Sequence, residues 1–132
     1  MKKYVIKDVI RTSYAKVAAN GASKGCCSGG CGCSAQDAKA SSMKLGYSEE
    51  DVNAVPIESN MGLGCGNPLA IASLKAGETV VDMGCGGGFD CFLARKQVGE
   101  SGYVIGVDMT PDMVTLARKN VEKSGYSNID IR

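Results

Sequence analysis

The chain is 132 residues long, which is the size of one domain and enough to bury a core of reasonable size. Lys and Arg together number 15 against 14 Asp and Glu, so no basic surplus indicates a nucleic-acid or anionic-membrane partner. The aromatic fraction of 5%, with no Trp, also disfavours a platform on which nucleobases stack. No apolar run approaches the roughly 18 residues of a membrane span, and the N-terminus lacks a signal-like apolar segment. We therefore expect a cytoplasmic protein.

The counts of cysteine and histidine restrict the chemistry further. There are 7 Cys, an odd number, and reduced thiols that act as ligands are favoured over a disulfide framework. There is no His at all, which excludes Ser-His and Cys-His nucleophilic pairs, histidine general bases and mixed Cys/His zinc sites. Whatever reaction takes place here must proceed without an imidazole.

The N-terminal 60 residues are predicted to form a helical extension with a cysteine-rich loop. In the first 18 or so residues, apolar side chains recur at helical spacing, which predicts an amphipathic helix that packs against the rest of the protein. These apolar positions are Val5, Ile6, Val9, Ile10, Tyr14 and Val17. The following stretch, residues 20–33, is too rich in glycine for regular structure and is predicted to be a loop.

Two further helices are expected before the segment that carries the main motifs. A weakly helical stretch runs from Ser34 to Leu45 and closes at Gly46. Ser48 followed by Asp51 predicts an N-cap and a short helix that Pro56 ends. Residues 61–132 are then predicted to be the first half of a cofactor-binding domain.

From residue 67 onward the pattern predicts a helix and then alternating strands and helices. The expected elements are a helix from Asn67 to Lys75 ended by Gly77, strands at 79–83, 103–108 and 128–132, and helices at 88–98 and 110–124. This βαβαβ order predicts an α/β fold, one wing of a doubly wound parallel sheet of Rossmann-like type. The first strand would be an unpaired apolar edge, because nothing follows to build the other side. We expect a fragment of a longer protein, or a sheet that another chain completes through self-association.

A glycine loop lies between the first predicted strand and the helix after it. Asp82, Gly84, Gly86 and Gly88 form the pattern D-x-G-x-G-x-G, which lets a ligand approach the backbone and exposes the amides of a helix N-terminus. Asp108 ends the next strand, where an acid is placed to accept hydrogen bonds from ribose hydroxyls. A structural turn without a ligand and a nicotinamide nucleotide are the alternatives.

The acid two residues before the first glycine favours one cofactor. A carboxylate at Asp82 is awkward beside a phosphate but suits a ligand that carries an ammonium and a sulfonium group. The loop therefore resembles motif I of class I methyltransferases, and the predicted cofactor is S-adenosylmethionine. The fold class that follows is a partial class I methyltransferase fold with the helical, Cys-rich extension before it.

The remaining cysteines suggest what receives the methyl group. Four thiols, Cys26, Cys27, Cys31 and Cys33, occur within eight residues, and Cys65 precedes the helix before the first strand. A zinc site of four thiolates is the natural alternative, but it normally uses widely separated pairs of cysteines. Soft thiolates in a flexible loop suit a thiophilic ion with coordination number three. Adventitious metal binding by the loop is the other interpretation.

At three elements the sequence resembles the arsenite methyltransferases. They are Gly64-Cys-Gly-Asn-Pro68, Val80-Val-Asp-Met-Gly-Cys-Gly-Gly-Gly-Phe-Asp-Cys-Phe-Leu-Ala94 and Val104-Ile-Gly-Val-Asp-Met-Thr-Pro-Asp-Met113. The resemblance extends from about Tyr14 to the end of the chain. It implies that trivalent arsenic, a small-molecule substrate, is bound by cysteines and methylated with S-adenosylmethionine.

The resemblance also implies roles for individual residues. Cys65 and either Cys26 or Cys27 would be arsenic ligands, and thus the catalytic and metal-binding thiols. Asp82, Gly84, Gly86, Gly88 and Asp108 would bind the cofactor, with Met109 beside the adenine. Cys85 stands in the glycine loop where the family usually has Ser, and is taken as part of the cofactor site. Cys91 is interpreted as a small buried apolar residue. The family's other arsenic-binding cysteines lie in a second half that this chain lacks.

The expected chemistry needs no proton transfer. Arsenic held by thiolates keeps a lone pair that can attack a sulfonium methyl in line, so catalysis requires positioning and desolvation. Two alternatives stay open: a module that binds S-adenosylmethionine or arsenic without turnover, and a methyltransferase for another small molecule whose cysteines store a metal.

Overall fold

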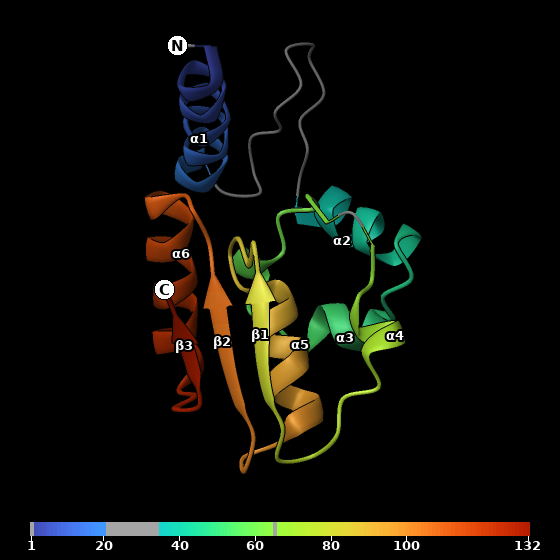
Figure 1. Ribbon diagram of the computed structural model, residues 1–132. Helices are drawn as coiled ribbons and strands as arrows, with labels where there is room; N and C mark the ends of the chain where they lie inside the picture. Colours follow the sequence, from blue (N-terminus) through green and yellow to red (C-terminus); the bar gives the residue numbers. More distant parts are fainter. Residues whose placement is uncertain (1, 21–34, 65) are drawn as a thin grey trace.

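The computed structural model describes residues 2–20, 35–64 and 66–132 (Figure 1). Within these residues the helices are α1 (Lys2–Asn20), α2 (Ala35–Lys44), α3 (Glu49–Asn53), the 3-10 turn η2 (Ile57–Ser59), α4 (Leu69–Ala72), α5 (Phe89–Val98) and α6 (Pro111–Ser124). The strands are β1 (Thr79–Met83), β2 (Tyr103–Val107) and β3 (Ile129–Ile131). Among the helices of the described ranges, none is both long and apolar enough to cross a bilayer.

The three strands form one parallel sheet in the order β1-β2-β3. Thr79 lies opposite Tyr103 in the first pair, and Val104 lies opposite Ile129 in the second. Each step from one strand to the next passes through a helix, as a parallel connection requires. The predicted βαβαβ wing is therefore confirmed, with each strand within two residues of its expected ends.

Helices α5 and α6 cover the same face of this sheet. Gly106 of β2 has so little space that a Cβ there would stand 2.7 Å from Ile131 Cδ1 and 2.8 Å from the Sγ of Cys91 in α5. Ala117 of α6 is fully buried in the same core. Glycine at position 106 thus allows helix α5 to approach the sheet closely. The predicted burial of Cys91 is confirmed, since its exposed fraction is 0%.

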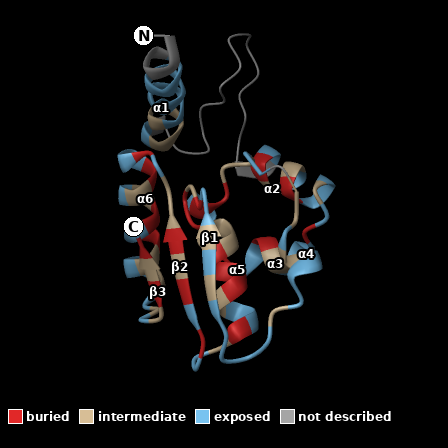
Figure 2. Ribbon diagram, viewed as in Figure 1, coloured by how far each residue is buried: buried red, intermediate tan, exposed pale blue. Residues whose placement is uncertain are grey.

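Among the described residues, β2 is the one neighbour of β1 in the sheet, and no helix covers the opposite face of β1 (Figure 2). Asp82 faces α5, where its carboxylate accepts a hydrogen bond from Cys91. Side chains alternate along a strand, so Val81 and Met83 face away from that helix. They are 54% and 76% exposed. The expectation that the first strand is a free apolar edge is confirmed for the described residues.

The N-terminal region differs in part from its prediction. Helix α1 forms, but its apolar positions Ile6 and Val9 are each 60% exposed, and Ile10 and Tyr14 are exposed as well. Helix α1 does contact α6 (Figure 1), so the expected packing is seen only in part, with Val17 half-buried and the rest of the described stripe exposed. The predicted cysteine-rich loop falls, apart from Asn20, outside the described residues.

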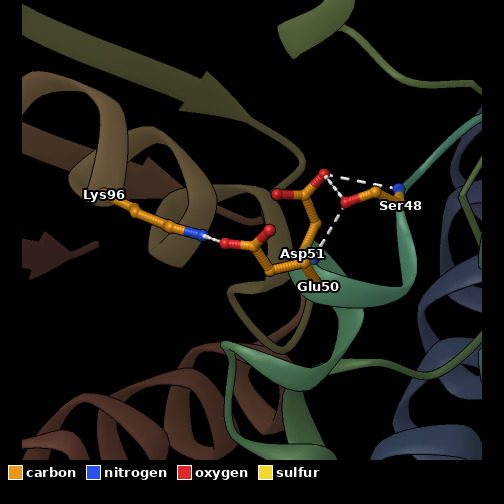
Figure 3. Close-up of polar contacts among 4 residues, drawn as sticks. All are labelled: Ser48, Glu50, Asp51 and Lys96. Atoms are coloured by element: carbon orange, nitrogen blue, oxygen red, sulfur yellow. Dashed lines mark hydrogen bonds and ion pairs between the residues drawn. The ribbon is translucent and has the colours of Figure 1, made fainter.

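The short helix α3 begins as the sequence predicts (Figure 3). The Ser48 hydroxyl accepts a hydrogen bond from the Asp51 amide at 3.1 Å, and the Asp51 carboxylate accepts one from the Ser48 amide at 3.3 Å. This reciprocal arrangement is a capping box, which satisfies amides that the first turn leaves unpaired. Glu50 of the same helix forms an ion pair with Lys96 of α5 at 3.4 Å, on the surface of the protein.

Helix α4 is shorter than predicted. It has a single turn, Leu69–Ala72, because Ser73 adopts the left-handed conformation with φ +48° and ends it there. The side chain of Asn67 accepts a hydrogen bond from the Ala70 amide, as an N-cap residue does. The expectation that the helix continues to Lys75 was wrong. The end of the helix could not be recognised in the sequence, because Ser73, and not a glycine, stands where the backbone turns.

Candidate functional site

The glycine loop leaves the carboxyl end of β1 and enters α5 through a residue that needs a left-handed backbone. Gly88 is the N-cap of α5 with φ +93°. Gly87 has little room for a side chain, because a Cβ there would lie 3.1 Å from the carbonyl oxygen of Ser59. The loop is thus packed against the end of η2. Its backbone is also held from α6, where the Asn120 amide nitrogen donates to the Gly87 carbonyl at 3.0 Å.

Asp108 fixes the loop to the end of β2. One carboxylate oxygen accepts a hydrogen bond from the Gly86 amide at 2.9 Å, and the other accepts one from the Thr110 amide at 2.8 Å. The carboxylate therefore ties together the glycine loop and the start of α6. Each oxygen keeps a second lone pair, so contacts to a ribose remain chemically available to Asp108.

Asp82 lies partly buried between β1 and α5. Its Oδ2 accepts a hydrogen bond from the Cys91 thiol at 3.3 Å. Burial raises the pKa of this carboxyl above its usual value, and the neighbouring Asp108 raises it further, while the Cys91 hydrogen bond lowers it. A cationic ligand would stabilise the charged form of Asp82, because its positive charge offsets both the loss of solvation and the repulsion from Asp108.

Asp90, in the first turn of α5, is a further carboxylate that the sequence prediction missed. Its Oδ1 accepts a hydrogen bond from the Tyr47 hydroxyl at 2.6 Å. Burial raises the pKa of Asp90, and the charge on Asp82 raises it too. The Tyr47 ring packs edge-on against Phe89, with ring centroids 4.9 Å apart. Since Tyr47 and Asp90 are far apart in the sequence, spacing alone could not identify them as partners.

The two other predicted cofactor residues occupy different surroundings. The Cys85 side chain is buried over Gly106, close to Cys91, and its amide donates to the Val107 carbonyl at 3.0 Å. Both Cys85 and Cys91 are free thiols. Met109 is 54% exposed directly after Asp108, and its side chain is open to a ligand. Contact of Cys85 or Met109 with the cofactor stays a prediction.

The predicted arsenic ligands Cys26, Cys27 and Cys65 lie outside the described residues. Within the described part of the chain, no group of three or more Cys, Asp or Glu could hold a metal ion. The residues on either side of position 65 are described, and the Gly66 carbonyl oxygen lies 3.0 Å from the Tyr47 hydroxyl. The ligand assignment therefore stays a prediction from the sequence.

Three carboxylates thus surround the glycine loop: one from β1, one directly after β2 and one from α5. Among the ion pairs of the described residues, none involves Asp82, Asp90 or Asp108. An anionic cluster of this kind repels a pyrophosphate and attracts an ammonium or sulfonium group. The electrostatics favour S-adenosylmethionine over a dinucleotide.

Comparison with known proteins places the chain by sequence. A family model described as a methyltransferase domain matches residues 74–132. Arsenite methyltransferase of Halobacterium salinarum is 46% identical over 134 residues, covering 96% of this chain and 34% of that protein. By sequence, the chain is similar to an arsenite methyltransferase over nearly its whole length. The cofactor predicted from the glycine loop, S-adenosylmethionine, agrees with these matches to methyltransferases.

Other relatives agree with this placement. Arsenite methyltransferase of Aquipseudomonas alcaligenes is 38% identical over 73 residues, covering 52% of this chain and 20% of that protein. A solved structure of a protein-L-isoaspartate O-methyltransferase has a TM-score of 0.51 at 19% identity, over 75% of this chain and 41% of that chain. This likeness concerns the fold alone, and it agrees with the predicted class I methyltransferase fold. The chain spans about a third or less of the length of the curated relatives it matches first.

Proposed function

We propose that this chain forms the cofactor-binding part of an S-adenosylmethionine-dependent arsenite methyltransferase. The observation that carries the proposal is the glycine loop surrounded by Asp82, Asp90 and Asp108 in a chain whose sequence matches that family. The backbone between Asp82 and Gly88 would hold the methionine portion, and Asp108 the ribose. When bound, S-adenosylmethionine supplies an electrophilic methyl group on a sulfonium centre.

The proposed methyl acceptor is trivalent arsenic bound by thiolates. Cys65 and either Cys26 or Cys27 are the proposed ligands, on the strength of the family match and of the chemistry of soft thiolates. A thiolate-bound arsenic keeps its lone pair, and the chain contains no histidine to act as a base. The task of these residues is therefore to hold arsenic in line with the sulfonium methyl and to exclude water.

The proposal is tested by incubating the chain with arsenite and S-adenosylmethionine carrying a labelled methyl group. Methylated arsenic as product supports the enzyme. Binding of both ligands without product would instead support the alternative hypothesis of a module that binds its ligands without turnover. A Cys65→Ser variant should bind arsenite more weakly, and an unchanged affinity would contradict the ligand assignment. Calorimetry should also give tighter binding of S-adenosylmethionine than of NADH, since the reverse order would contradict the cofactor.

We also propose that two copies associate through the free edge of β1. An unpaired strand edge presents a row of amide and carbonyl groups that another strand can pair with. Val81 and Met83 add exposed apolar surface beside that edge.

For the whole protein we propose a cytoplasmic role in arsenic detoxification.

A further inference from the structure

The connection between α2 and α3 holds the chain on both sides of Cys65. The Tyr47 hydroxyl lies 3.0 Å from the Gly66 carbonyl oxygen, and the Asn67 amide nitrogen donates to the Gly46 carbonyl at 3.1 Å. On the other side, Gly64 packs so closely on Leu45 that a Cβ at Gly64 would stand 3.2 Å from the leucine Cδ1. The three consecutive residues 45–47 therefore contact Gly64, Gly66 and Asn67, the described residues on either side of position 65.

Tyr47 also reaches the helix that follows the cofactor loop. Its hydroxyl lies 2.6 Å from Asp90 Oδ1 in the first turn of α5. One phenolic group is thus within hydrogen-bonding distance of two acceptors, one beside the proposed arsenic ligand and one beside the cofactor loop. The tyrosine is 5% exposed, and its ring is fixed against Phe89. A hydrogen bond to a charged group in such surroundings is among the stronger ones in proteins.

The position of this tyrosine relative to α5 is fixed by its neighbours in the chain. Ser48, the next residue, caps α3, and Glu50 of that helix pairs with Lys96 of α5 (Figure 3). Val52 of α3 belongs to the same core as Phe92 of α5. A change at the cofactor loop that moves Asp90 would therefore alter its contact with the Tyr47 hydroxyl. The contact between that hydroxyl and Gly66 would change as a result.

We infer that Tyr47 is a positioning residue that couples cofactor binding to arsenite binding, by joining the backbone next to Cys65 to the first turn of α5. This inference rests on the proposed function, since it takes Cys65 as an arsenic ligand. A phenol has a single proton, so Gly66 and Asp90 share or compete for one donor. The ammonium group, which S-adenosylmethionine and S-adenosylhomocysteine share, brings positive charge to the loop. This charge changes how strongly Asp90 attracts the Tyr47 proton, and thereby the strength of the contact with Gly66.

The experiment measures the dissociation constant of arsenite by equilibrium dialysis, with and without saturating S-adenosylhomocysteine, which has no methyl to transfer. The ratio of the two constants is the coupling factor. In the wild-type chain we expect a factor of about five or more, as is usual for coupled sites. Tyr47→Phe keeps the ring and removes the hydroxyl, and its coupling factor should fall towards one. Tyr126→Phe removes a hydroxyl from a ring that packs on Phe92 and should leave the factor unchanged.

Two variants of Asp90 separate coupling from a merely structural role. Asp90→Ala removes the acceptor and should lose the coupling, with no further loss when it is combined with Tyr47→Phe. Asp90→Asn keeps an acceptor oxygen and should retain part of the coupling. If Tyr47→Phe fails to fold, the contrast between these two variants still tests the inference. Equal weakening of both ligands at an unchanged coupling factor would overturn it.

The outcome also distinguishes the inference from the function on which it rests. A wild-type chain that binds arsenite and S-adenosylhomocysteine with a coupling factor of one refutes the coupling and leaves the proposed function intact. A chain that binds neither ligand refutes both. Dialysis of the Cys65→Ser variant measures how much arsenite the remaining thiols bind. For this binding, the dissociation constant should be the same with and without S-adenosylhomocysteine.

Discussion

The Asp108 carboxylate accepts a hydrogen bond from the Gly86 amide at 2.9 Å, and this contact fixes the glycine loop to the end of β2. The same carboxylate accepts the Thr110 amide at the start of α6. One side chain therefore organises two backbone segments at the carboxyl edge of the sheet, where ligands of open α/β folds bind.

Replacing Asp108 with Ala should weaken binding of S-adenosylmethionine by about tenfold or more. Hydrogen bonds to charged groups contribute about 1.5–3 kcal/mol, and each 1.4 kcal/mol corresponds to a factor of ten. Calorimetric titration would measure the change. Asp112→Ala, at an exposed acid in the first turn of α6, is the matched control and should bind as the wild type does. Equal affinity of the Asp108 and Asp112 variants would contradict the proposed role of Asp108.

Asp82 and Asp90 should make the stability of the wild type decrease as pH rises. Burial raises the pKa of both carboxyls, so the folded state holds their protons more tightly than the unfolded state does. Their contribution to stability is fully present below the unfolded pKa and is lost as pH rises through the higher folded pKa. Asp82→Asn should therefore be more stable than the wild type at pH 7 and should lose that advantage at acidic pH.

Denaturant unfolding at several pH values would measure this difference. Comparison with the wild type cancels the opposite contribution of surface acids such as Glu58, whose pKa is lowered by hydrogen bonds from Lys123 and the backbone. The same variant should bind S-adenosylmethionine more weakly, because it removes a charge from the cofactor site. A variant that is less stable than the wild type at neutral pH would contradict the prediction. It would show that the charged Asp82 carboxylate is stabilised by its surroundings in the folded protein.

Gly106→Ala should destabilise the fold by about 1–3 kcal/mol, the usual cost of an overpacked core. The added methyl would meet Ile131, Cys91 and Cys85 at 2.7, 2.8 and 3.0 Å. The free energy of unfolding from denaturant titration measures the effect. Gly66→Ala, where a Cβ would meet nothing within 4 Å, serves as the control for stability. If both variants unfold at the same denaturant concentration, α5 does not approach the sheet as closely as described.

The fold between residues 79 and 132 could be predicted because local signals mark each boundary. Gly88, Pro111 and Gly125 stand where helices begin or end, and apolar runs of strand length lie between them. Such signals act within a few residues of the chain and can be read from the sequence. The end of α4 could not be predicted, because Ser73 adopts a left-handed backbone that is usual for glycine or asparagine.

The site could be predicted only in part, because only its local motifs can be recognised in the sequence. Asp82, Asp108 and the glycines form a local motif, so their roles could be proposed from spacing. The contact between Tyr47 and Asp90 joins residues 43 positions apart and depends on how α3 packs on α5. Similarly, the exposure of the apolar side chains of α1 depends on where that helix lies, which its amphipathic pattern does not determine.

The free edge of β1 should make the chain self-associate as its concentration rises. Light scattering over a concentration series should give a mass above the 13.7 kDa of one chain. Val81→Lys places a charge beside the edge, and charges there are a common means of preventing strand pairing. This variant should stay monomeric over the same range. Ile71→Lys changes an exposed apolar residue on α4, away from the edge, and should associate as the wild type does. A monomeric wild type at the highest concentration would contradict the proposed edge contact.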